Sequence, residues 1–133
     1  MLSDHTEPTS HAVASGWKLK DFLPGDGTSA GAHLSADADD GWIDVAVPGD
    51  VHRALIEIGR IPDPFYDRNE TACAWMEQRE WWYRVHFETP REALDADVRQ
   101  ELVCHGLDTF ATIYLHRSAA GRDARARHQR SAA

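Results

Sequence analysis

Acidic residues flank two aromatic residues in the segment from residue 63 to residue 70. Asp63, Asp67 and Glu70 lie close in sequence to Phe65 and Tyr66. Proteins often hold sugars with such a set, because a ring can stack on the sugar while carboxylates accept hydrogen bonds from its hydroxyl groups. Asp and Asn also favour turns for reasons of backbone geometry. From the residues alone, a turn is the simpler interpretation of this segment.

Other chemistry is not indicated by the sequence. The patterns of nucleophilic hydrolases, phosphate-binding loops, dinucleotide-binding folds and helical zinc sites do not occur. The eight histidines are scattered, and Cys73 and Cys104 form no closely spaced ligand pair. We therefore expect no metal, no cofactor and two free thiols. Free thiols, a polar N-terminal segment without signal-peptide character and the lack of a long apolar run together predict a cytoplasmic protein.

Charge is distributed unevenly along the 133 residues. The last 17 residues carry five arginines and one aspartate, whereas the first 116 residues carry 9 basic and 21 acidic residues, a formal charge of −12. Such an acidic body repels nucleic acid phosphates and anionic lipids. Neither nucleic acid nor a membrane is therefore expected as a partner.

Hydrophobic periodicity predicts mainly strands. Apolar or aromatic residues alternate or cluster at residues 17–22, 42–47, 81–87, 101–105 and 110–115. One short helix is predicted near residues 50–58, with Asp50 as the N-cap and Gly59 just after its end. This order of elements indicates an all-β antiparallel sandwich with one short helix.

Three parts of the chain are expected. Residues 1–15 are polar and aperiodic and read as a flexible leader, and residues 16–116 form the domain. Residues 117–133 contain no bulky apolar residue, so this basic tail is predicted to be disordered.

Several segments, taken in order along residues 16–115, resemble the start of a β-mannosidase, a glycoside hydrolase of family 2. The resemblance rests on Trp17-Lys-Leu, Val47-Pro-Gly-Asp-Val-His52, Asp63-Pro-Phe-Tyr66, Asn69-Glu70, Trp75, Trp81-Trp-Tyr-Arg84 and Gly106-Leu-Asp-Thr-Phe-Ala-Thr-Ile-Tyr-Leu115. It implies a jelly-roll β-sandwich of the galactose-binding-like type, which in that family precedes a catalytic (β/α)₈ barrel.

The resemblance also implies what the chain does and lacks. Family members cleave terminal β-mannosides with retention, using two glutamates on the barrel that lie about 5 Å apart. A barrel needs roughly 250 residues, so we expect no catalytic residue here. The family continues from its Tyr-Leu strand into an Asn-Gly turn, where this chain has His116 and Arg117. We therefore expect an incomplete sandwich, a truncated copy whose unpaired strand edges leave it marginally stable.

Three functions remain open at this point. The leading one is a non-catalytic sandwich domain of a β-mannosidase-like enzyme of carbohydrate catabolism. The alternatives are a free-standing carbohydrate-binding module and a docking domain for a separate glycosidase barrel. The partner is then a β-mannoside or the barrel. The expected pocket-wall or stacking residues are Asp63, Phe65, Tyr66, Trp75, Trp81 and Trp82. If the chain did cleave a mannoside, Glu70, Glu77, Glu80 and Glu101 would be the first acids to test.

Overall fold

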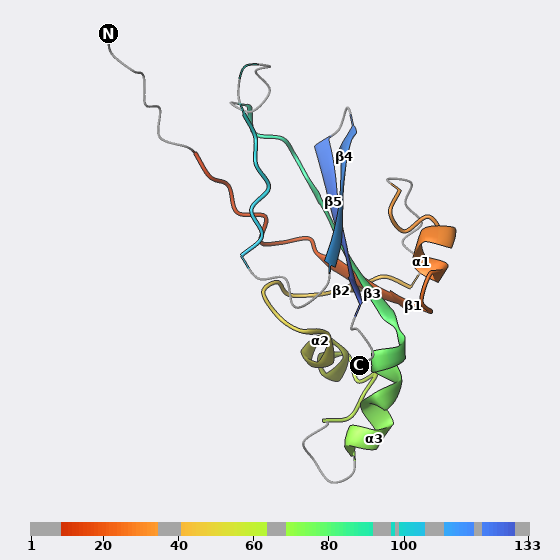
Figure 1. The fold of residues 1–133 in the computed structure, drawn as a ribbon. Coiled ribbons are helices and arrows are strands. Elements are labelled where there is room, and N and C mark those ends of the chain that lie inside the picture. Colours follow the sequence, from red (N-terminus) through yellow and green to blue (C-terminus); the bar gives the residue numbers. More distant parts are fainter. Residues whose placement is uncertain are drawn as a thin grey trace.

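The centre of the fold is one five-stranded antiparallel sheet (Figure 1). The computed structural model describes residues 9–34, 41–63, 69–91, 97, 99–105, 111–118 and 121–129. The strands are β1 (Lys18–Phe22), β2 (Ile43–Asp44), β3 (Glu80–Phe87), β4 (Ala111–Ser118) and β5 (Gly121–Gln129). Their order in the sheet is β2-β1-β3-β5-β4, so β3 is central and β2 and β4 lie at the edges.

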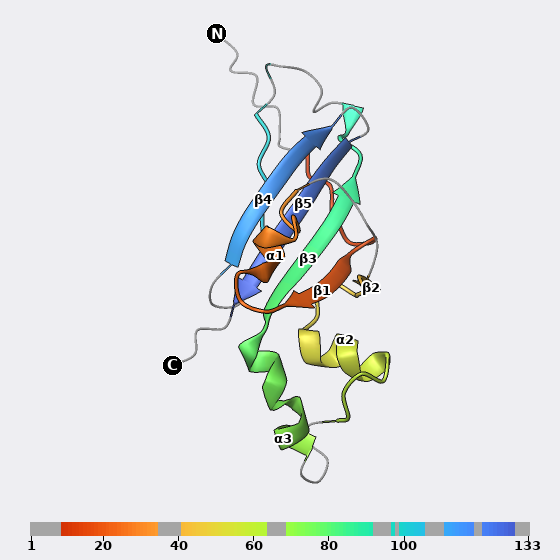
Figure 2. The same ribbon diagram turned by 90° about the vertical axis from the view of Figure 1, so that its right-hand side faces the viewer.

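Short helices lie around one end and both sides of this sheet. They are α1 (Asp26–Ser29), α2 (Val51–Glu57), α3 (Asn69–Cys73) and a 3₁₀ turn, η1 (Ala74–Gln78). Figure 1 views the sheet nearly on edge and shows α1 on one side and α2 on the other. Figure 2 shows α3 and η1 continuing into the start of β3.

Side chains on the α2 side of the sheet form the main hydrophobic core. Leu19 of β1 pairs with Tyr83 of β3, and both belong to this face together with Trp81. The buried members of the cluster are Leu19, Ala54, Leu55, Ile61, Cys73, Met76 and Trp81. Because α2, the segment after it and η1 supply Leu55, Ile61 and Met76, they cover the β1–β3 half of the sheet.

The opposite face of β3 is buried as well, beneath α1. Trp82 and Glu80 are both 0% exposed, and Gly27 of α1 is packed against them. A Cβ atom at position 27 would overlap Nε1 of Trp82 and Oε1 of Glu80, so this contact requires glycine. A strand buried on both faces reads as a nearly continuous run of bulky residues, as β3 does.

Several predictions agree with the structure. The strands predicted at 17–22, 81–87 and 110–115 correspond to β1, β3 and β4. The predicted helix corresponds to α2, with Asp50 as its N-cap and Gly59 at a φ of 75° beyond its end. The prediction of mainly strands is thus confirmed for the described residues, although α1, α3 and η1 add helical turns that it did not include.

Other predictions were wrong. Residues 101–105 have no regular structure, and β2 covers only two of the six residues predicted as a strand. The larger correction concerns the tail predicted to be disordered, because its residues 121–129 form β5, between β3 and β4. The prediction weighed side-chain hydrophobicity, whereas β5 is held by backbone pairing along its whole length, from Glu80↔Gln129 to Phe87↔Arg122.

No helix in the part of the chain that the structure describes is long and apolar enough to cross a bilayer.

Candidate functional site

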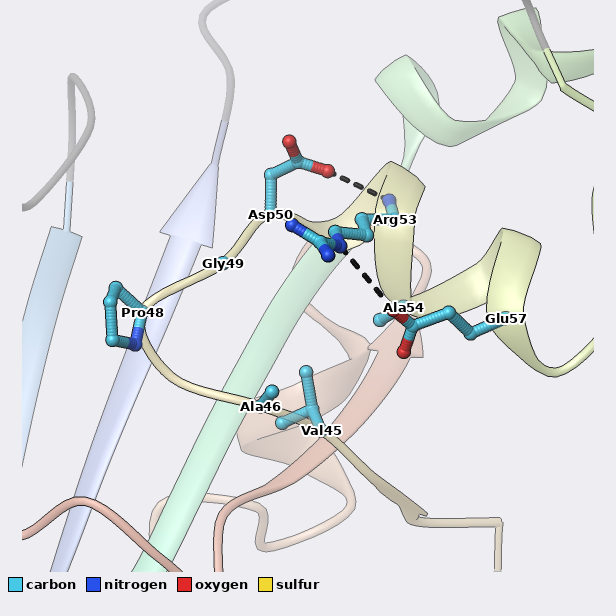
Figure 3. A pocket seen from close by; sticks show the side chains of 8 residues that line it. All are labelled: Val45, Ala46, Pro48, Gly49, Asp50, Arg53, Ala54 and Glu57. Atoms are coloured by element: carbon cyan, nitrogen blue, oxygen red, sulfur yellow. Dashed lines mark hydrogen bonds and ion pairs between the residues drawn. The ribbon is translucent and has the colours of Figure 1, made fainter.

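A shallow pocket lies where the chain leaves β2 and enters α2 (Figure 3). Its volume is about 170 Å³, and its lining residues are Val45, Ala46, Pro48, Gly49, Asp50, Arg53, Ala54 and Glu57. Pockets that enclose a small molecule usually measure about 300–1,000 Å³. This pocket is therefore too small to enclose a small molecule by itself, and it can form only part of a binding site.

The helix start builds the polar side of the pocket. Asp50 has an extended backbone, and its Oδ1 accepts a hydrogen bond from the backbone N–H of Arg53 at 2.8 Å. This is the usual way in which an aspartate satisfies a free N–H group in the first turn of a helix. The cap also determines where the Asp50 carboxylate lies, at the rim of the pocket (Figure 3).

One turn further along, a surface ion pair completes the polar lining. Nε of Arg53 lies 3.3 Å from Oε1 of Glu57, and the two side chains are 79% and 61% exposed. Exposed pairs at this spacing contribute only about 0.3–0.5 kcal/mol. Both groups can therefore exchange this contact for hydrogen bonds to a hydroxylated ligand at little cost.

Tyr83 adds an electrostatic link between the sheet and the helix start. Burial, followed by the negative charge of Asp50, raises the pKa of Tyr83 from 10.0 to about 12. Both causes disfavour the phenolate. The phenol is therefore neutral at physiological pH and keeps its O–H as a hydrogen-bond donor.

Two of the expected stacking residues are part of the core. Trp81 is 5% exposed, and its Nε1 donates a hydrogen bond to the backbone carbonyl of Met76 at 3.1 Å. Trp82 is 0% exposed, and its ring stacks on Tyr114 with the ring centroids 5.6 Å apart. A ring buried on both faces has no surface left for a sugar, so in this structure these two residues pack the fold.

Trp75 and Asp63 lie nearer the surface. Trp75 is half-buried, with its ring centroid 6.1 Å from that of Trp81 and 5.8 Å from the guanidinium carbon of Arg60. Asp63 is exposed, at the end of a described segment. Phe65 and Tyr66 lie outside the described residues.

Glu80 is a buried acid whose role the sequence did not reveal. Its carboxylate accepts hydrogen bonds from the backbone N–H groups of Gly25 (3.1 Å) and Gly27 (2.9 Å) and from Nε1 of Trp82 (3.0 Å). Three donors satisfy a buried carboxylate and connect the α1 segment to β3. The sequence contains only a weak signal of this contact. A glycine-rich segment has backbone N–H groups that need an acceptor, but the acid that accepts from them lies in a strand more than fifty residues away.

The other acids considered for hydrolysis are Glu77, Glu101 and Glu70. Glu77 is exposed, and Glu101 is an exposed partner of Arg99 at 2.9 Å. The side chain of Glu70 is not described. Within the described segments, no group of three or more His, Cys, Asp or Glu residues comes together as metal ligands, and Cys73 and Cys104 are both free.

Comparison with known proteins places these features in a family context. The family model described as "Glycosyl hydrolase 2 galactose-binding domain-like" matches residues 24–129. Beta-mannosidase B of Emericella nidulans is 34% identical over 108 residues, and that of Aspergillus terreus is 34% identical over 106 residues. These alignments cover 80% and 79% of this chain but 11% of each relative, so the chain spans about a tenth of their length.

A solved structure gives the same result for the fold. The β-D-mannosidase of Dictyoglomus thermophilum superposes with a TM-score of 0.63 at 24% sequence identity. The superposition covers 88% of this chain and 15% of that protein.

Proposed function

Because the chain belongs to the glycosyl hydrolase 2 galactose-binding domain-like family, we propose that it is the non-catalytic N-terminal domain of a β-mannosidase-like enzyme. The observation that carries the proposal is the extent of the family match, residues 24–129, set against relatives of which the chain spans 11%. In the proposal, hydrolysis of terminal β-mannosides belongs to the complete enzyme. The resemblance deduced from the motifs, and with it the galactose-binding-like fold, is confirmed.

The environment of the acids supports a non-catalytic role. Retaining hydrolysis needs two carboxyl groups about 5 Å apart, one of them free to attack. Of the acids that the structure describes, only Glu80 and Asp21 are not exposed. Glu80 accepts hydrogen bonds from three N–H donors, and Asp21 lies between Arg60 at 3.5 Å and Arg79 at 3.6 Å. These interactions stabilise the fold and leave neither acid available as a nucleophile.

The pocket at the start of α2 supports a wall-forming contribution. Asp50, Arg53 and Glu57 place charged hydrogen-bonding groups around about 170 Å³. Carboxylate and guanidinium groups pair well with sugar hydroxyls or with a polar protein surface. In the proposal this rim faces either the β-mannoside or the catalytic barrel, with Asp63, Phe65, Tyr66 and Trp75 as further contacts. A cytoplasmic location is part of the proposal and is supported by the two free cysteines.

Trans-complementation of a truncated β-mannosidase tests this role. The segment of the Emericella nidulans β-mannosidase B that aligns with this chain is deleted, and p-nitrophenyl β-mannoside is the substrate. We expect no turnover by the chain alone, none by the truncated enzyme, and recovered turnover when the two are mixed. The deleted segment itself, supplied in trans, is the positive control.

Two results would contradict the proposal. Turnover by the purified chain, unaffected by removal of contaminating glycosidases, would show that it is itself catalytic. Recovery with the enzyme's own segment but not with this chain would show that the chain cannot act as that domain. In the second case, saturable heat in a calorimetric titration with mannose or mannobiose would identify a free-standing carbohydrate-binding module instead.

A further inference from the structure

The two edges of the sheet are protected very differently. At one edge, β2 has only two residues, and Lys18 and Asp44 form an ion pair there at 2.7 Å. At the other edge, β4 has eight residues, about 27 Å of strand at a rise of 3.4 Å per residue. Short length and charge are the usual means of blocking edge-to-edge pairing. Only the β2 edge has both.

The outer strand also presents apolar side chains. Ile113 and Leu115 are 40% and 48% exposed. Through β5 they pair in line with Tyr83 and Val85 of β3, so they extend the face that carries the main core. None of the described strands lies beyond β4. The strand thus combines an edge on which no described strand pairs with an apolar stripe.

The sequence of β4 is complementary to itself when two copies run antiparallel. With Tyr114 opposite Tyr114 of the second copy, Ile113 lies opposite Leu115 in both directions, and Thr112 lies opposite His116. The one charged residue of the strand, Arg117, lies opposite Ala111, and β4 contains no acid. Cross-strand pairs of apolar residues stabilise a sheet, and like charges directly opposite destabilise it. This register pairs apolar residues across the two strands and places no like charges directly opposite each other.

We propose that β4 is a self-association edge through which two copies of this chain pair antiparallel, in a register centred on Tyr114. The pairing joins two five-stranded sheets into one, and the short, charged β2 edges limit the assembly to a dimer. Such a closed two-fold contact is isologous. The inference concerns the free chain and does not depend on the proposed enzymatic role.

Charge on the neighbouring strand makes the association sensitive to salt. The strands β4 and β5 together contain Arg117, Arg122, Arg125 and Arg127 against Asp123, a formal charge of +3. Two such hairpins repel one another, and salt screens that repulsion over about 10 Å at 0.1 M. Association between copies therefore strengthens as salt is added. Binding of an acidic partner to the same edge would instead become weaker as salt is added.

Analytical ultracentrifugation over a wide concentration range tests the dimer. We expect a mass of twice 14.9 kDa at high concentration and a lower dissociation constant at higher salt. The double variant Ile113→Lys with Leu115→Lys places lysine opposite lysine and should raise the dissociation constant at least tenfold. The matched control is Leu23→Lys, which replaces a leucine of similar exposure (52%) outside the strand and should leave it unchanged.

A charge-swap variant tests the register. Ile113→Glu combined with Leu115→Lys places each glutamate opposite a lysine of the second copy, so dimerisation should return to within a few fold of the wild type. A register shifted to Ile113 opposite Ile113 would leave glutamate facing glutamate, and dimerisation would stay weak. Near-ultraviolet circular dichroism checks that each variant retains its packed tryptophans.

Four results would overturn the inference. They are a wild-type mass of 14.9 kDa at every concentration, an unchanged dissociation constant in the double-lysine variant, no recovery in the charge-swap variant, and weaker association at higher salt.

Discussion

The two halves of the sheet are stabilised by different interactions. In the β2-β1-β3 half, side chains are buried on both faces, with Leu19 and Trp82 at 0% exposure and Val85 at 2%. In the β5-β4 half, the two strands are aligned by their backbone pairing with β3 and with each other, while Ile113 and Leu115 of β4 remain 40% and 48% exposed.

This difference indicates where the stability of the chain resides. Burying a large apolar side chain contributes about 1.5–3 kcal/mol, whereas an intramolecular hydrogen bond contributes a net 0.5–1.5 kcal/mol because water competes for it. Substitutions in the β1–β3 half should therefore be costly, and similar substitutions in the β4–β5 half should be mild. Four predictions test this difference, from the largest expected effect to the smallest.

Replacing Trp82 with alanine should have the largest effect. The substitution removes a fully buried ring, its stacking on Tyr114 and the hydrogen bond to Glu80. We expect the free energy of unfolding to fall by about 3–5 kcal/mol, measured by urea denaturation. Leu23→Ala, at an exposed position, is the control. A cost below about 1 kcal/mol would contradict the double-sided core.

Glu80→Gln tests the buried hydrogen-bond hub next to Trp82. The amide keeps one acceptor oxygen but turns an NH₂ group toward backbone N–H donors, so at least one hydrogen bond is lost. The expected cost is about 1.5–3 kcal/mol in urea denaturation. Glu57→Gln, which alters an exposed ion pair, should change stability by less than about 0.5 kcal/mol. Equal costs for the two variants would rule out the proposed role of Glu80.

Alkaline pH should weaken the core through Tyr83. Its pKa is about 12 in the folded chain and near 10 in the unfolded chain. The folded state therefore binds this proton more tightly, and the resulting stability is complete below pH 10 and is lost as the pH rises from 10 to 12. Equilibrium unfolding followed across this range should show the decrease.

Two variants isolate the origin of this pH dependence. Tyr83→Phe should abolish it, and Asp50→Asn should reduce it while keeping a good N-cap for α2. If the Tyr83→Phe variant still lost stability steeply between pH 10 and pH 12, another titrating group would be responsible.

Leu115→Ala should have the smallest effect. The side chain is half exposed on the outermost strand, so truncation removes little buried area. We expect a change within about 0.5 kcal/mol in urea denaturation at a concentration low enough to keep the chain monomeric. A loss comparable to that of Trp82→Ala would show that the two halves of the sheet are equally packed.

Patterns local in sequence predicted much of the fold. Asp50, the apolar spacing that follows it and Gly59 predicted α2, and the bulky run at 81–87 predicted β3. These signals are short-range, because caps, turn residues and periodicity act within one or two turns of chain. Family motifs at similar positions were sufficient to identify the domain.

Contacts distant in sequence could not be predicted in this way. The tryptophan pair 81–82 looked equally suitable for a core or for a sugar platform, and only the packing of η1 and α1 against β3 showed that both rings are buried. Residues 121–129 have a composition typical of disorder, yet they form a strand because two neighbouring strands offer them backbone partners.

By itself, the sequence determined α2, the strands β1, β3 and β4, and the family, since these depend on residue types at short, ordered spacing. Only the tertiary structure decided which side chains are buried and which remain available to a partner. Burial depends on what lies opposite each residue across the sheet, as with Glu80 beneath α1, more than fifty residues away in the chain.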